Sequence, residues 1–229
     1  MLGMKSWLEI RWRLLIALTF VLVPLGIHYA QGISGPGDVN RLMAAVAMMW
    51  LFAAAGLAGS GIKTQAPIQA AKGLHGSTHF TLSLPVSRTR LLVVRAGMGL
   101  LGLVGVILAS SAAAWVLFPL VRSGSTPFDL LAWAFTASCC AVAFNAITVL
   151  LSTFIDEVWQ FWVTIITVVS LRALTARFPP PPDFDLFRIM MESTPLALGG
   201  LPWPAISVAL GLATICFFIA AKVAEAREY

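Results

Sequence analysis

The chain has 229 residues, of which 59% are hydrophobic and 11% are charged, with 15 Lys and Arg against 10 Asp and Glu. A soluble domain carries about a quarter charged residues, and disordered chains are polar and highly charged. Both classes are therefore excluded, and the length allows about six membrane spans of roughly 20 residues with short loops. The net charge is +5, and the basic residues lie beside apolar runs. This placement is typical of the loops of membrane proteins and argues against a nucleic-acid partner.

The first segment, residues 1–13, predicts an amphipathic helix in the membrane interface. Its sequence MLGMKSWLEIRWR can place tryptophan and leucine on one face and charged residues on another. A first span over 14–30 follows, and Pro24 is expected to bend it. A cleaved signal peptide is the alternative, but the apolar run is long, and His28 stands where cleavage needs a small residue. We therefore expect a retained anchor.

Apolar runs separated by turn residues predict five further spans. They cover 42–59, 91–120, 130–154, 158–174 and 203–221. Between the fifth and sixth spans, residues 175–202 predict a loop with one or two helical turns over 185–192. A re-entrant fifth run, which would leave five spans, is the alternative. The expected fold class is an all-α polytopic membrane protein with six spans.

The distribution of Lys and Arg predicts the orientation. With a cytoplasmic N-terminus, the inner side holds ten of these residues and the outer side five. Because cytoplasmic loops carry the excess of basic residues, both termini are expected inside. Residues 60–90 would then form a cytoplasmic segment, and residues 175–202 an extracytoplasmic loop.

The sequence contains two incomplete catalytic or cofactor-binding motifs. Residues 56–64, GLAGSGIKT, have the glycine spacing of a phosphate loop, but Ile62 separates Gly61 from the lysine, and no strand precedes them. His75 and His79 have the spacing of a zinc motif without its glutamate. We expect no catalytic, cofactor-binding or metal-binding residues in this chain. The three cysteines lie within apolar runs and predict small buried hydrophobic side chains: Cys139, Cys140 and Cys216.

A transport pathway has few polar candidates. No Asp or Glu lies in the middle of a predicted span, which argues against an ion-coupled carrier. Asn145 is the strongly polar residue deep in a span, and it either bonds a neighbouring helix or lines a pathway. Aromatic and methionine residues of the second and fifth spans either face lipid or line an apolar cavity. The candidates are Met48, Met49, Phe52, Trp159 and Trp162.

Residues 76–95, GSTHFTLSLPVSRTRLLVVR, predict a short cytoplasmic helix followed by the third span. Ser77 is a good helix cap, and Pro85 closes the element. Ser87 and Arg88 begin the next helix. The apolar side chains can fill a groove on another protein, and the basic flank can contact anionic head groups.

The stretch LSLPVSRTRLLVVR resembles the signature of ABC transporter type 2 permeases, in which L-P-[VI]-S-R-x-R lies between the second and third spans. The order of elements is also similar along nearly the whole chain. Where many relatives carry an acidic residue upstream of the motif, this chain has Gln65, Gln69 and Lys72. By resemblance, the ATPase-coupling segment contains Ser77, Phe80, Leu82, Leu84, Pro85, Ser87 and Arg88.

The resemblance implies a permease subunit of an ATP-driven exporter in the bacterial inner membrane. Two copies of a separate ATPase subunit would bind ATP and Mg, and a second permease copy would complete a homodimer or a related heterodimer. The apolar interior favours a hydrophobic or amphipathic substrate. Two other function classes stay open: a non-transporting scaffold or sensor subunit, and an intramembrane enzyme acting on lipid. The serines that such an enzyme could use have no base within reach in the sequence: Ser110, Ser111, Ser138 and Ser152.

Overall fold

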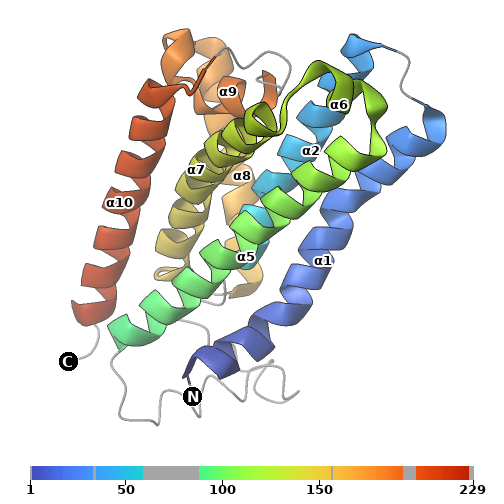
Figure 1. Cartoon of the computed structure of the whole chain (residues 1–229). Coiled ribbons are helices and arrows are strands. Elements are labelled where there is room, and N and C mark those ends of the chain that lie inside the picture. The colour runs from blue at the N-terminus through green and yellow to red at the C-terminus, as the bar shows by residue number, and fades with distance from the viewer. Residues whose placement is uncertain (1, 33–34, 59–87, 156, 193–199, 227–229) are drawn as a thin grey trace.

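A computed structural model describes residues 2–32, 35–58, 88–155, 157–192 and 200–226. Within these ranges the chain is built from helices (Figure 1). In chain order they are α1 (Leu2–Gln31), α2 (Pro36–Leu57), α5 (Arg88–Leu117), α6 (Pro119–Gly124), α7 (Pro127–Ser152), α8 (Glu157–Arg177), the 3-10 helix η1 (Pro182–Phe184), α9 (Leu186–Glu192) and α10 (Trp203–Ala226).

Six of the described helices are long and apolar enough to cross a membrane. The spanning stretches are Ile10–Gln31, Gly37–Leu57, Thr89–Leu117, Pro127–Ser152, Trp159–Arg177 and Trp203–Ala226. The six predicted spans are therefore confirmed as helices of spanning length. The fifth is one uninterrupted helix of 21 residues, which argues against a re-entrant fifth run. The described residues are all-α, and their six long apolar helices make the chain a multi-pass membrane protein.

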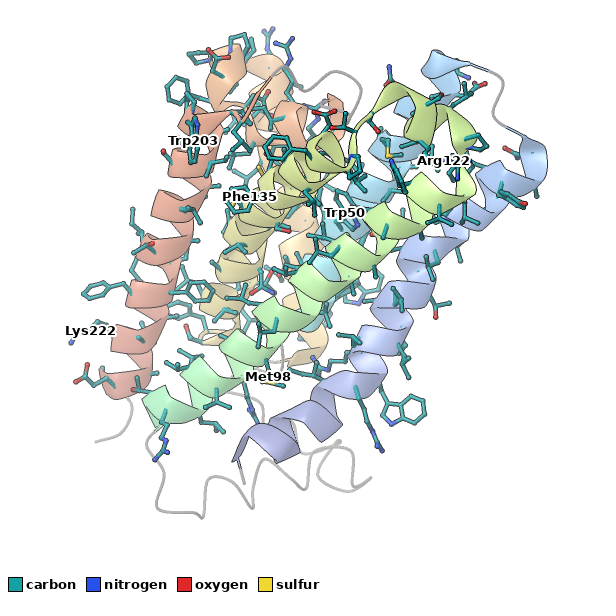
Figure 2. All side chains as sticks on the ribbon, in the orientation of Figure 1. Trp50, Met98, Arg122, Phe135, Trp203 and Lys222 are labelled. Carbon is teal, nitrogen blue, oxygen red and sulfur yellow. The ribbon has the colours of Figure 1, made fainter. Side chains whose placement is uncertain are left out.

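The six long helices run alternately up and down, so the two ends of the chain lie at the same end of the bundle (Figure 1). We call this the terminal end. The last turn of α2 and the first turn of α5 also lie there. The opposite end carries α6, η1 and α9. Labelled side chains mark the two ends, since Arg122 lies at the end opposite to Lys222 (Figure 2).

Several predicted boundaries change in the structure. Helix α1 continues from residue 2 to residue 31, so no break separates the predicted interfacial segment 1–13 from the first span, and Pro24 lies inside the helix. The side chains of residues 1–9 lie outside those described, and the amphipathic face stays a prediction. At its other end α1 stops at Gly32, whose positive φ of 74° suits glycine.

The third span ends at Leu117 rather than at the predicted residue 120. Phe118 precedes a proline and adopts extended backbone angles of −111° and 103°, because Pro119 excludes the helical conformation at the residue before it. The short helix α6 then begins at that proline. At the C-terminus, α10 continues to Ala226, five residues beyond the predicted limit of the sixth span.

The loop between the fifth and sixth spans contains the predicted helical turns. They form α9, and the 3-10 helix η1 precedes them outside the predicted range 185–192. The Asp185 carboxylate accepts hydrogen bonds from the backbone N–H groups of Phe187, at 3.0 Å, and Arg188, at 3.1 Å, and so caps the start of α9. Arg172 of α8 lies over the Phe187 ring, with its guanidinium carbon 6.0 Å from the ring centroid. These contacts fix α9 against the end of the bundle.

Helix α7 is the central element of the bundle. It begins with a capping box in which Thr126 and Asp129 exchange hydrogen bonds between side chains and backbone, with Pro127 at the first helical position. It contacts α2, α5, α8, α9 and α10. Its buried face is rich in alanine, serine and threonine, and such small residues let membrane helices approach closely.

Candidate functional site

A cavity of about 530 Å³ lies between α1, α2 and α8. This volume is within the range of small-molecule sites in proteins, about 300–1,000 Å³. Three helix faces line it: Arg13, Ile16, Ala17 and Phe20 from α1; Met49, Phe52, Ala53, Ala55 and Gly56 from α2; and Gln160, Phe161, Trp162 and Ile165 from α8. We call this space the α1–α2–α8 cavity.

Small residues make room for the cavity, and aromatic rings form its walls. Ala17, Ala53 and Gly56 carry little or no side chain where α1 and α2 face the space. The rings of Phe20 and Phe52 meet edge to face with centroids 6.2 Å apart. On α8, the Phe161 and Trp162 rings lie 5.7 Å apart in the same geometry.

One charged residue, Arg13, lines the cavity, and it lies at the end nearest the terminal end of the bundle. The lining residues of α1 run from Arg13 to Phe20, a separation of seven positions that corresponds to about 10 Å of helix. Arg13 stands at the terminal end of this run and Phe20 at the deep end. The α8 residues of the lining, Gln160 to Ile165, belong to the first half of that helix, which also lies at the terminal end. The cavity therefore occupies the half of the bundle nearest the two termini.

The predicted pathway residues separate into two groups. Met49, Phe52 and Trp162 line the cavity. Met48 and Trp159 do not line it: their side chains are 40% and 64% exposed on the outside of the bundle. Their pathway role stays a prediction, whereas the cavity gives the first three a common location.

Sequence reasoning missed several lining residues, although a signal for them exists. The α1 residues follow the spacing i, i+3, i+4, i+7 from Arg13 to Phe20, and the α2 residues follow it from Met49 to Gly56. This spacing places residues on one helical face. Uniform hydrophobicity hides such a face in a membrane helix, since the lipid side is as apolar as the inner side.

Asn145 lies elsewhere, at the contact of α7 with α2. It is completely buried, and its Nδ2 donates to the backbone oxygen of Ala54 at 2.9 Å. Its Oδ1 has no hydrogen-bond partner among the described residues. The interhelical hydrogen bond that the sequence allowed is thus present, and Asn145 is outside the lining of the cavity.

The last turn of α2 is held on a second side by α5. A side-chain carbon added at Gly99 would collide with the backbone oxygen of Leu57, so only glycine permits this approach of the two helices. We call the contacts of Ala54 and Leu57 with Asn145 and Gly99 the α2 junction. It lies immediately before residues 59–87.

Most of the predicted coupling residues lie outside the described residues. This holds for Ser77, Phe80, Leu82, Leu84, Pro85 and Ser87. Arg88 is the first residue of α5 and so lies at the terminal end. The possible metal ligands His75 and His79 also fall outside. In the part of the chain that is described, no three His, Cys, Asp or Glu residues are grouped as metal ligands.

The hydroxyls that an intramembrane enzyme could use have structural contacts. The hydroxyls of Ser111 and Ser138 donate to backbone oxygens one turn earlier in their own helices, as do those of Ser110 and Ser152. The three cysteines are free and buried, as predicted. Arg95, near the start of α5, is buried in the bundle with 6% exposure.

Comparison of the chain with protein-family models, with curated proteins and with solved structures finds no match. The functional inference therefore depends on the residues and geometry described above.

Proposed function

We propose that this chain is the transmembrane permease subunit of an ATP-driven exporter of the ABC type 2 kind. It moves a hydrophobic or amphipathic substrate out of the cytoplasm, and a separate subunit hydrolyses the ATP. The observation that carries the proposal is the motif LPVSRTR at residues 84–90, directly at the start of α5.

The position of this motif supports the proposal. Its described end, at Arg88, lies at the terminal end together with the last turn of α2 (Figure 1). A partner that contacts residues 59–87 would act next to the α2 junction, where α2, α5 and α7 are held together. A displacement of residues 59–87 by the partner would therefore be transmitted to α2, α5 and α7 together.

The proposal includes the cellular setting. The protein resides in the bacterial inner membrane with both termini in the cytoplasm. Two ATPase subunits bind on the cytoplasmic face and hold ATP and Mg, and a second permease copy, identical or related, completes the pathway. The α1–α2–α8 cavity is the substrate-binding region on each copy.

Co-purification tests the partner. The tagged full-length chain, extracted from its native membrane in mild detergent, is expected to retain an ATPase subunit and to show vanadate-sensitive ATP hydrolysis. A chain that is correctly inserted but never retains such a subunit would contradict the exporter role and favour the scaffold or sensor subunit.

Variants of the motif test the coupling. Leu84→Asp and Arg88→Glu are expected to abolish export while membrane insertion stays intact, because both change the segment assigned to the ATPase contact. Arg122→Glu is the matched control, since it makes the same change of charge on an exposed residue at the opposite end of the bundle (Figure 2). Normal export by both motif variants would refute the coupling assignment.

A further inference from the structure

We propose that the α1–α2–α8 cavity binds a single-chain amphiphile with an anionic head group, taken from the membrane leaflet at the terminal end. The inference names the substrate class of the proposed exporter. It rests on that function only in treating the bound amphiphile as cargo.

The chemistry of the lining selects an amphiphile. Apart from the Arg13 guanidinium and the Gln160 amide, the lining consists of aliphatic and aromatic side chains and glycine. A fully polar solute would lose most of its hydration there and could bond only to these two polar side chains. Arg13 is the charged member and carries a positive charge, so it favours an anionic group at its end of the cavity.

The depth of the cavity is smaller than the thickness of one leaflet. The hydrocarbon core of a bilayer is about 30 Å thick, so one leaflet contributes about 15 Å. The lining extends about 10 Å along α1 from Arg13 inward. A ligand with its head group at Arg13 would therefore place its chain against the Phe20 and Phe52 rings, parallel to the neighbouring lipid chains.

The cavity is open rather than enclosed. Ile16, Phe161 and Trp162 line the cavity and are also exposed on the outside of the bundle. An amphiphile can therefore enter sideways from the membrane without crossing water. A two-chain phospholipid is larger than the drug-sized ligands that cavities of this volume enclose, which favours a single chain.

Native mass spectrometry of the purified full-length chain in neutral detergent tests the proposal. The probes are palmitate, hexadecanol and hexadecyltrimethylammonium, which share a chain length and differ in head-group charge. We expect palmitate to bind at least tenfold more tightly than the other two. Equal binding of all three, or tighter binding of the cation, would overturn the proposal.

Two variants locate the site. Arg13→Gln is expected to weaken palmitate binding about tenfold and to leave hexadecanol binding unchanged. Its control is Arg11→Gln, which removes the same charge from an exposed position of α1 outside the lining and should change neither ligand. If both arginine variants have the same effect on palmitate, the assigned head-group position is wrong.

A cavity-filling variant tests where the alkyl chain of the ligand binds. A side-chain carbon added at Gly56 meets no described atom within 4 Å, so Gly56→Leu fills the space without a collision at the backbone. It is expected to reduce binding of palmitate and hexadecanol alike, at an unchanged melting temperature. Gly97→Leu, also in open space but on α5 outside the lining, is the control. Full binding by Gly56→Leu would place the ligand elsewhere and refute the site.

These measurements are independent of the exporter role because they need no ATPase. Arginine-dependent binding in a chain that retains no ATPase subunit would support the site and contradict the exporter. Head-group-independent binding in a chain that does retain one would contradict the site alone.

Discussion

Helices α7 and α8 are consecutive in the chain, and both are long enough to span the membrane, yet they differ sharply in packing. In α7, 72% of the apolar stretch is buried inside the bundle, against 17% in α8. Helix α7 contacts five other helices, whereas the principal contacts of α8 are with α7 and α2. The most densely packed part of the bundle is thus centred on α7, whereas the cavity is bounded on one side by the peripheral helix α8.

Side-chain size explains this difference. Lipid is as apolar as leucine, so helices in a membrane associate through close packing and hydrogen bonds. The buried face of α7 is made largely of Ala, Ser, Thr and Cys. Helix α8 instead carries large side chains that stay exposed, among them Trp159, Trp162 and Ile166. We therefore expect substitutions near α7 to affect stability and substitutions on α8 to affect binding.

Two tryptophans make the most direct test of this comparison. Trp133 of α7 is 1% exposed, with its ring centroid 4.9 Å from that of Trp50, whereas Trp159 of α8 projects from the bundle. Trp133→Ala should reduce the free energy of unfolding by about 4 kcal/mol because it leaves a large void. Trp159→Ala should change it by less than about 0.5 kcal/mol. Unfolding in mixed micelles measures both, and equal losses would remove the distinction between the helices.

Gly99→Ala is expected to have the next largest effect. The added methyl group would meet the backbone oxygen of Leu57, so α5 and α2 must separate, at a cost of about 3 kcal/mol. Gly97→Ala is the control, since open space surrounds that position. It should be neutral or stabilising, because alanine favours the helix by up to about 1 kcal/mol. The order of the two melting temperatures checks this prediction, and a reversed order would contradict the close approach.

Asn145→Asp should destabilise by about 2 kcal/mol. It replaces the donor that bonds Ala54 with a second acceptor facing the same backbone oxygen. Asn145→Leu has similar volume and removes both the bond and the unpartnered Oδ1, so its cost should be below about 1 kcal/mol. Unfolding free energies of the two variants measure the difference. Equal values would mean that the hydrogen bond contributes little to the α2 junction.

Ser110→Ala is expected to give the smallest measurable loss, about 1 kcal/mol. The Trp50 Nε1 donates to the Ser110 hydroxyl at 3.0 Å, and the variant leaves this buried N–H without its acceptor. Ser111→Ala is the matched control, because the Ser111 hydroxyl bonds a carbonyl of its own helix. Melting temperatures of the two variants should differ by a few degrees, and identical values would contradict a role for the Trp50 bond.

The number of spans was predictable from sequence, because an apolar run of about 20 residues is long enough to cross the bilayer and must form a helix there to satisfy its backbone hydrogen bonds. The end of α5 was also encoded, in Pro119, but the apolar run continues past it and hid the break. The cavity could not be located from composition. Met49 and Met48 are chemically identical neighbours, and only the orientation of α2 against α1 and α8 decides that one lines the cavity and the other does not. Arg95 shows the same limit, since its burial depends on tertiary packing.

Pro24 has a consequence for the width of the cavity. Proline has no N–H, so the backbone oxygen of Phe20 lacks the donor that a helix normally supplies four residues later. Phe20 is also the innermost α1 residue of the lining. The backbone hydrogen bond that α1 lacks thus lies at the inner end of the cavity. Because a proline inside a helix permits a bend, the direction of the half-helix that carries Arg13, and with it the width of the cavity, depends on the helix angle at Pro24.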